Sequence, residues 1–542
     1  MQLHYVDWII IILYLLGMIG LSVYLARGQK TESDYYLGGN DTGSWPIAIS
    51  TMATQCSTNS ILGAPAFVAF SIGGGLIWLQ YEIAVPLAMI ILMIFLLPLY
   101  RKLNIISVYS YLEKRFGKGT RTALSILFQF LRSFSTGVTV YGISKVIEYC
   151  TGIPFLYAVI LLGVITVIYD SLGGMKAVIW SDVIQMVVLY GAIIVTIVIA
   201  VNLCGGFFET INLFKSADPS RMAAIDFSHT GFDGKSYAFW PMLFGGLFLY
   251  ISYYGCDQTQ VQRELSTRNV DDTNHSLFLN GMLRFPLVIT YCFLGVCIGA
   301  YVFKNPEFRT LLPVNGNGDY NYNLAVPVFV IKYFPVGVIG LFMVGLFSAA
   351  MSSLDSTINS LSATTMEDII KGQCGKKISM KQELIYSKLL TVFWGTICTI
   401  FAFYVENVSD SIIVSINKIG SLANGPILAI FMLGILTKKS NGFGAVIGLV
   451  AGFFFNLFLW KYAPQVSWLW WNVIGFFITF ILGYVISMFV GTVKDFDVAS
   501  LTWQKGHSVK TFGLKKNWNI YYGVLGGYAA IILVVLILIG MR

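Results

Sequence analysis

Charged side chains are scarce in this sequence of 542 residues. Asp, Glu, Lys and Arg make up only 11% of it, against about 25% in soluble domains. Apolar residues make up 56%, and many lie in runs of about 20, the length that crosses a bilayer. This composition excludes a large soluble domain and predicts a protein embedded in a lipid bilayer. The net charge of +8 is then expected from basic loops on the inner side rather than from a nucleic-acid-binding surface.

Other shortages narrow the function further. The four histidines all fall near or outside the ends of apolar runs, so none is offered for chemistry within the membrane. The eight cysteines form no CxxC pair and, Cys374 apart, lie in or beside apolar runs, where cysteine is expected to pack as a small core residue. No GxxxxGK[ST] phosphate-binding loop is present. The sequence therefore predicts neither an enzyme nor a pump driven by its own hydrolysis of ATP.

About 14 hydrophobic spans are expected from a length of about 20 residues each. The first, over residues 7–26, is predicted to be a retained helix with its N-terminus outside, because it lacks the basic start and cleavage site of a signal peptide. The others are expected at 45–73, 77–101, 121–150, 155–173, 179–204, 236–262, 276–303, 323–366, 382–405, 409–436, 440–462, 466–492 and 519–541.

Loop charges test this order of spans. The loops expected inside hold roughly 22 Lys and Arg residues and those expected outside roughly 7, which is the bias that the positive-inside rule requires. An even number of spans also places the C-terminus outside. The prediction is a multi-pass protein of the cell (plasma) membrane with both termini outside.

Polar residues interrupt two of the spans. Residues 51–60, TMATQCSTNS, place a polar patch at mid-membrane, and residues 253–263, YYGCDQTQVQR, make a later span polar toward its inner end. Each opens a set of five spans, and paired interrupted spans indicate a transporter built from inverted repeats. The predicted divisions are 1–44 (leading helix and linker), 45–204 (first repeat), 205–235 (outer loop), 236–436 (second repeat) and 437–542 (three trailing helices).

The most informative polar segment is SAAMSSLDSTINS at 348–360, at the end of an apolar span. Helical spacing puts Ser352, Asp355, Ser356 and Asn359 on one face. Hydroxyls and a carboxylate are costly in hydrocarbon unless they face a partner, and a small hard cation such as Na⁺ fits them. The alternative is that the hydroxyls bond back to their own helix and that Asp355 ends near water.

Four other charged side chains in or beside the spans could serve a site. Asp182, in GGMKAVIWSDVIQ at 173–185, is either a helix cap or a cation ligand. Glu82 either pairs with a hydroxyl or amine of a solute or is an interfacial glutamate. Arg132 and Arg284 either hold an anionic solute group or snorkel to the interface.

Four motifs together resemble the sodium:solute symporter family, which includes sodium/galactose, sialic acid, proline, iodide, monocarboxylate and vitamin cotransporters. They are GGMKAVIWSDVIQ at 173–185, DQTQVQR at 257–263, SAAMSSLDSTINS at 348–360 and NKIGSLANGPILAIFMLGILTKK at 417–439. The likeness runs from the first helix to about residue 460. It implies an all-α membrane protein with a LeuT-type core of five plus five inverted helices, one leading helix and about three trailing ones.

The resemblance also implies site residues. A first Na⁺ site maps to Ala53, Cys56, Ala349, Ser352 and Ser353. A further Na⁺ site, as in the sialic acid transporters, maps to Asp182, Ser352, Asp355 and Ser356, although those relatives have serine in place of Asp355. The substrate pocket maps to Ser57, Ser60, Glu82, Arg132, Asp257, Arg284 and Asn417.

The predicted function is Na⁺-coupled symport of a small polar organic solute, a sugar, sugar acid or monocarboxylate, by alternating access, with two coupled Na⁺ ions as a hypothesis. The membrane potential supplies about 2.3 kcal/mol per charge per 100 mV. Three alternatives stay open at this point: a Na⁺-coupled carrier of inorganic anions, an H⁺-coupled symporter using Asp182 and Asp355, and a sodium channel or sensor. A membrane-embedded enzyme is a further rival, which the lack of an intramembrane histidine disfavours.

Overall fold

The computed structural model of the protein describes residues 3–56, 59–314, 318–372, 378–405, 410–491, 498–503 and 513–541. The described chain is helical apart from two isolated β-bridges. Eleven of its helices are long and apolar enough to cross a membrane. Because two further spans are broken and one long helix covers two predicted spans, this number is compatible with the 14 expected.

The first repeat begins with a broken helix. Its first half is α3 (Ser44–Gln55), followed by a π-helical turn η2 (Asn59–Gly63) and α4 (Ala64–Ala69). The second span runs through η3 (Leu76–Ile83), α5 (Ala84–Ile91), η4 (Leu92–Leu96) and α6 (Leu97–Leu103). The third is α8 (Lys118–Thr151), and the fourth and fifth are both part of α9 (Phe155–Cys204).

A glycine divides α9 into its two spans. Gly174 has φ 57° and ψ −158°, values that break the helix. A side chain at this position would be strained by the positive φ, and its Cβ would lie 2.5 Å from the backbone oxygen of Tyr35. The sequence predicted an interruption here, between residues 173 and 179, and the structure reduces it to a sharp bend.

The second repeat also begins with a broken helix, α11 (Gly246–Cys256) and α12 (Gln258–Leu265), joined at Asp257. It continues with α13 (Val270–Lys304), α15 (Val338–Thr364), α17 (Met380–Val405) and α18 (Asp410–Leu436). The expected span 323–366 is in fact two helices, since α14 (Ala325–Tyr333) ends before α15 starts. The segment between them contains Pro335 and Gly337, and Gly337 has φ 88°.

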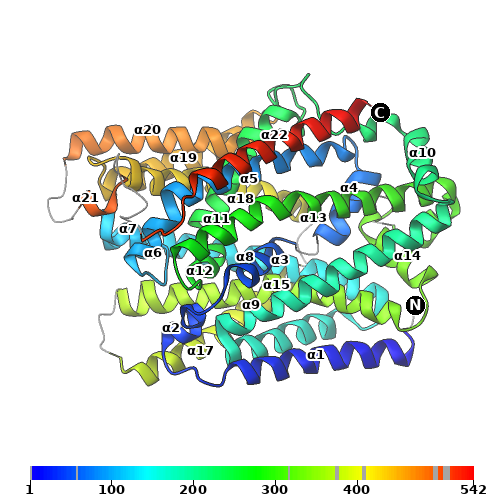
Figure 1. Ribbon diagram of the computed structural model, residues 1–542, viewed down its shortest axis with the longest axis horizontal. Coiled ribbons are helices and arrows are strands. Elements are labelled where there is room, and N and C mark those ends of the chain that lie inside the picture. The colour runs from blue at the N-terminus through cyan, green and yellow to red at the C-terminus, as the bar shows by residue number, and fades with distance from the viewer. Residues whose placement is uncertain are drawn as a thin grey trace.

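The remaining helices flank this core. The long ones are α1 (Tyr5–Leu25), α19 (Gly442–Tyr462), α20 (Trp470–Val490) and α22 (Asn519–Met541). Four short helices lie in the connections between long helices: α2 (Glu32–Leu37), α7 (Tyr109–Phe116), α10 (Phe207–Ala217) and α21 (Val498–Leu501). Helix α1 packs on α9 and α15, while α19 and α20 pack on α18. Both chain ends lie beside α10 and α14, and α2, α6, α7 and α21 lie at the opposite end (Figure 1).

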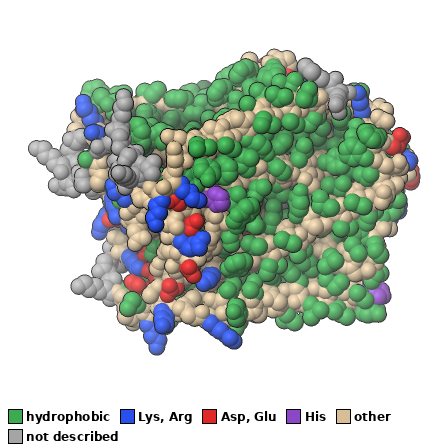
Figure 2. Space-filling model, in the orientation of Figure 1, with side chains coloured by type: hydrophobic (Ala, Val, Ile, Leu, Met, Phe, Trp, Pro, Cys, Tyr) green, Lys and Arg blue, Asp and Glu red, His purple; other side chains and the backbone are tan. Residues whose placement is uncertain are grey.

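The surface shows the band that a bilayer would cover. Hydrophobic side chains fill the middle of the face seen in Figure 2, and blue and red side chains gather at the end where α2 and α6 lie. Helices α3, α9, α12 and α15 meet inside this band, because α15 packs on α9 and both α3 and α12 pack on α15. Every predicted cation ligand in the described residues belongs to these helices or to the break that follows α3.

Candidate functional site

The break in the first core helix frees backbone oxygens beside α15. Helix α3 ends at Gln55, and Cys56 leaves the helical conformation with ψ 65°. The carbonyl groups in the last turn of a helix have no intrahelical donors. Ala53 lies in that last turn and is buried. Its carbonyl is therefore available to a ligand in the way that Na⁺ sites of broken-helix transporters require.

The predicted first Na⁺ site comes together around a small cavity. The cavity is lined by Ala53 from α3, Ser348, Ala349 and Ser352 from α15, and Gln185, Met186 and Leu189 from α9. Ser353 is half-buried on the same turn of α15, and its hydroxyl donates weakly to the Ala349 carbonyl at 3.4 Å. Cys56 is fully buried next to the break. The carbonyl oxygens of Ala53 and Ala349 and the hydroxyls of Ser352 and Ser353 are of the kind that Na⁺, a hard cation, prefers as ligands.

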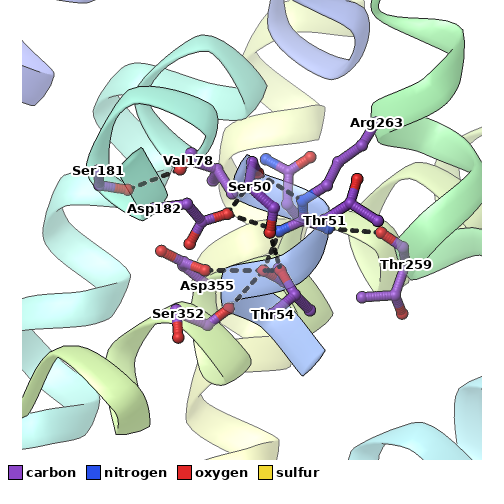
Figure 3. A network of polar contacts seen from close by, with 12 residues as sticks. Ser50, Thr51, Thr54, Val178, Ser181, Asp182, Thr259, Arg263, Ser352 and Asp355 are labelled. Atoms are coloured by element: carbon purple, nitrogen blue, oxygen red, sulfur yellow. Dashed lines mark hydrogen bonds and ion pairs between the residues drawn. The ribbon is translucent and has the colours of Figure 1, made fainter. Parts of the chain in front are cut away.

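A fully buried arginine lies beside Asp182 and Ser356, where the sequence predicted only ligands of a cation. Arg263 of α12 pairs with the Asp182 carboxylate at 3.1 Å, and its Nε donates to the Ser50 hydroxyl at 2.8 Å. It also donates to the Thr259 carbonyl at 2.5 Å and to the Ser356 hydroxyl. Figure 3 shows the guanidinium reaching from α12 toward this group. The guanidinium therefore links α12 to α3, α9 and α15.

Asp355 lies on the other side of that network. It accepts hydrogen bonds from the hydroxyls of Tyr169 and of Ser356, the latter at 3.0 Å, and it is fully buried. Ser356 is also hydrogen-bonded to Thr54 of α3 at 3.1 Å. In Figure 3 the Asp182 and Asp355 side chains lie next to each other, and Oδ1 of Asp182 has no hydrogen-bond partner among the described residues. The structure thus brings together all four residues of the predicted second site, together with Arg263.

One predicted solute-binding pair bridges two repeats. The Arg284 Nε of α13 lies 3.3 Å from a Glu82 carboxylate oxygen, and both side chains are nearly fully buried. The other Glu82 oxygen accepts from the Tyr250 hydroxyl at 3.1 Å. The Nη1 of Arg284 is buried without a hydrogen-bond partner in the described chain. Since an unsatisfied buried donor is costly, this N–H group is suited to an acceptor oxygen of a bound solute.

A second pair lies at the break in the second repeat. Arg132 of α8 donates to the Asp257 carboxylate at 2.8 Å through Nε, and its guanidinium lies 5.4 Å from the centre of the Tyr253 ring. Asp257 also caps α12 by accepting from the Thr259 backbone N–H at 2.9 Å. Tyr253, Tyr254 and Tyr250 contact one another along α11 with ring centres 5.3 and 6.2 Å apart. Together the rings connect the two ion pairs.

The remaining predicted pocket residues divide into two groups. Ser60 is buried in η2 just after the break. Ser57 lies outside the described residues, as does the side chain of Asn417 on α18. No group of three or more His, Cys, Asp or Glu side chains suited to a metal ion is found in the part of the chain that the structure describes.

Sequence reasoning did not identify the role of Arg263, which it counted among the inner-loop cations. The signal that could have found it is its place in DQTQVQR, eight residues after Gly255 in a span that carries few other charges. Tyr169 and Asp170, at the end of the fourth span, were also passed over. A carboxylate within an apolar run was the available signal for Asp170.

The family is decided by comparison with known proteins. The sequence profile of the sodium:solute symporter family matches residues 35–452 of this chain. The chain belongs to the sodium:solute symporter family. It is 32% identical to the sodium/sialic acid symporter NanT of Aliivibrio fischeri, over 92% of this chain and 96% of that protein. It is 28% identical to the sodium/sialic acid symporter SiaT of Proteus mirabilis, over 91% and 98%.

A solved structure agrees with this membership. A Na⁺-coupled sialic acid symporter in a substrate-bound outward-open state superposes with a TM-score of 0.79 at 25% identity, covering 90% of this chain and 98% of that one. The predicted LeuT-type fold is confirmed, and the coupling ion of this symporter is Na⁺. The protein is a multi-pass membrane transporter. The assignments of individual site residues stay predictions.

The end of this symporter that lies opposite the two chain ends carries a cluster of charges centred on Lys371. Its ammonium contacts Glu32 of α2, Glu367 at 2.9 Å and Glu383 of α17 at 3.3 Å. Burial, and then repulsion by Glu367, raises the pKa of Glu32 from 4.5 to about 7. The cluster joins α2 and α17 to the segment that directly follows α15.

Glu32 is therefore expected to make the stability of the protein depend on pH. Because the pKa of Glu32 is higher in the folded protein than in the unfolded chain, its contribution to the stability of the fold is complete at pH values below the unfolded pKa of 4.5. This contribution is lost as the pH rises through the folded pKa of about 7. In Glu32→Gln the side chain stays neutral at every pH, so the stability of the variant does not fall in this range. We expect the Tm of the variant minus that of the wild type to increase by about 1–2 °C between pH 5 and pH 8. A difference that does not change with pH would contradict the assignment.

Proposed function

We propose that this symporter takes up a small sugar acid with Na⁺ by alternating access across the cell membrane, with both chain ends outside. The observation that carries the proposal is the meeting of two features at the broken helices. A narrow gap between α3, α9 and α15 is bordered by Ala53, Ala349 and Ser352, and Nη1 of the buried Arg284, which pairs with Glu82, has no hydrogen-bond partner among the described residues. The first feature suits Na⁺, and the second suits a carboxylate or hydroxyl of the solute.

The pocket chemistry supports a solute that carries both hydroxyls and a carboxylate. Arg284 can donate Nη1 to a carboxylate while its Nε remains with Glu82. Hydroxyl groups of a sugar ring would find Ser60, Tyr250 and the carboxylate of Glu82 as partners of the right kind. The named relatives that match over nine-tenths of the chain carry sialic acid, which is a sugar acid.

A neutral sugar is the second candidate, because the described pocket is charge-balanced. Arg284 is paired with Glu82, and Arg132 is paired with Asp257. A solute without net charge would leave both pairs intact, whereas an anion adds a charge that a co-bound Na⁺ must offset. Uptake into proteoliposomes, driven by an inward Na⁺ gradient, separates the candidates when a sugar acid, its neutral parent sugar and a short monocarboxylate are compared. Uptake of none of the three would contradict the proposal.

In the proposed mechanism Na⁺ joins the two repeats before the solute is carried. Na⁺ between the carbonyl of Ala53 on α3 and the hydroxyls of Ser352 and Ser353 on α15 would hold the broken helix against α15. The solute pocket lies next to the same break, so the ion would stabilise the conformation that binds solute. This shared helix break provides the coupling free energy between the two ligands.

Ser353→Ala is expected to weaken Na⁺ binding while leaving the fold intact. Removing one oxygen that contacts a charged ligand costs about 1.5–3 kcal/mol, which corresponds to a roughly 10- to 100-fold lower apparent affinity for Na⁺. The measurement is the Na⁺ concentration that half-maximally activates uptake, together with the Na⁺-induced rise in Tm of the purified protein. Ser379→Ala, at an exposed position before α17, is the matched control and should behave as the wild type. An unchanged Na⁺ affinity in Ser353→Ala would remove Ser353 from the site.

A further inference from the structure

A carboxyl group is buried between the two broken helices and has no cation to pair with. Glu264 lies at the end of α12, and its side chain has no exposed surface. The neighbouring Arg263 pairs instead with the Asp182 carboxylate at 3.1 Å, and Glu264 takes part in no ion pair among the described residues. An ionised carboxylate without a partner is very costly inside a protein.

The Glu264 carboxyl links α12 to two neighbouring helices, α3 and α13. Its Oε2 accepts a hydrogen bond from the Ser276 hydroxyl of α13, and its Oε1 accepts a weak one from the Thr51 hydroxyl of α3 at 3.4 Å. Asn280, one turn after Ser276 on α13, is buried, and its Oδ1 has no hydrogen-bond partner in the described chain. The surroundings of Glu264 therefore offer hydroxyls and a free acceptor.

The charged groups on the elements packed against α12 have partners of their own. Helix α3 carries no titratable side chain. On the other elements the pairs include Glu32 with Lys371, Arg101 with the Leu265 carbonyl, Asp271 with the Trp518 indole, Asp272 with Arg268, His275 with the Ser44 hydroxyl and Asp355 with the Tyr169 hydroxyl. Glu264 is therefore neutral in this arrangement, because a buried carboxyl without a cation takes up a proton instead of ionising.

We propose that Glu264 is a proton-binding site of this symporter and that its proton and Na⁺ stabilise the same packing of α3. In the proposed mechanism α3 is held against α15 by Na⁺ and moves when the ion leaves. Because Thr51 of α3 contacts one oxygen of Glu264, that movement admits water to the carboxyl, which then ionises. A proton on Glu264 therefore favours the arrangement that binds Na⁺.

Linkage gives the sign of this coupling. Glu264 binds its proton more tightly in the packed arrangement than after α3 has moved. Raising the pH through the titration of Glu264 therefore favours the moved arrangement and weakens Na⁺ binding. Direct competition between a proton and Na⁺ at Asp182 or Asp355 has the opposite sign, because it makes Na⁺ bind more tightly as the pH rises. The direction of the pH effect separates the two.

This inference rests on the Na⁺ coupling of the proposed function, and equilibrium binding of ²²Na⁺ to the purified full-length protein at pH 5.5 and pH 8.5 tests it. We expect the Na⁺ affinity of the wild type to be at least about fivefold lower at pH 8.5. In Glu264→Gln the side chain stays neutral, so the affinity should be equal at both pH values and close to that of the wild type at pH 5.5. Asp41→Asn, an exposed carboxylate in the linker before α3, should keep the pH dependence of the wild type.

Two results would overturn the proton site: a wild-type Na⁺ affinity that is constant or rises with pH, and an unchanged pH dependence in Glu264→Gln. If Glu264→Gln does not fold, Ser276→Ala decides. It removes a hydrogen bond to the ionised carboxyl, so the midpoint pH of the change in Na⁺ affinity should rise by about one unit, and an unmoved midpoint would contradict the site. A wild type that binds no Na⁺ would contradict the proposed function itself. Na⁺ binding whose pH dependence is insensitive to Glu264 would contradict only this inference.

Discussion

Arg263→Ala is expected to lower the free energy of unfolding by about 3–5 kcal/mol, because it leaves a buried carboxylate without its cation, and to reduce Na⁺-driven uptake to background. The guanidinium is fully buried and pairs with Asp182. It also supplies the donors for Ser50 of α3 and Ser356 of α15. No other cation in the described residues pairs with Asp182, so the variant would have an unpaired charge at the meeting point of four helices.

A double variant distinguishes the loss of the Arg263–Asp182 ion pair from a general loss of structure. Asp182→Asn combined with Arg263→Ala removes both charges, and we expect it to recover most of the lost stability without recovering uptake, because α12 is no longer tied to α9. Thermal unfolding in detergent and uptake into proteoliposomes measure the two effects. Arg268→Ala is the matched control, since Arg268 is largely exposed and pairs with Asp272 at the surface. Equal stability of Arg263→Ala and Arg268→Ala would show that the buried pair contributes nothing.

Arg284→Ala is expected to lower solute uptake by at least about 30-fold, since hot-spot arginines contribute about 2 kcal/mol or more to binding. The substitution removes Nη1, which has no hydrogen-bond partner among the described residues, and leaves Glu82 buried without its cation. Na⁺ binding should persist, because the cavity at Ala53 contains neither residue. The measurement is uptake of the solute identified in the panel, alongside ²²Na⁺ binding.

Two partner variants separate the roles of charge and of the free donor. Arg284→Lys keeps a positive charge for Glu82 but supplies a single ammonium in place of the planar fork, so it should restore folding and only part of the uptake. Arg284→Met with Glu82→Gln removes both charges and should restore folding but not uptake. Full uptake in either variant would show that Arg284 is structural and does not bind the solute.

The sequence determined the fold class because hydrocarbon permits few solutions. A backbone that crosses lipid must satisfy its own hydrogen bonds, so apolar runs of sufficient length are read as helices, and the polar interruptions at 51–60 and 253–263 are read as broken ones. The structure places breaks at both positions. The serines and Asp355 of 348–360 were recognisable for the same reason, since oxygens in a membrane need a partner.

Only the tertiary structure decided which charges face one another. Arg263 and Asp182 are 81 residues apart in the chain and Glu82 and Arg284 are 202 apart, so helix periodicity carries no information about either pair. The packing of α12 against α3 and α15 turned an arginine expected in a loop into the buried partner of a predicted ligand. The bend at Gly174 and the packing of α9 against α15 likewise brought Asp170 to Asn359, one turn from Asp355. Hydropathy sets which segments enter the membrane, whereas the pairing of their charges depends on helix rotation and depth, which only the packed core defines.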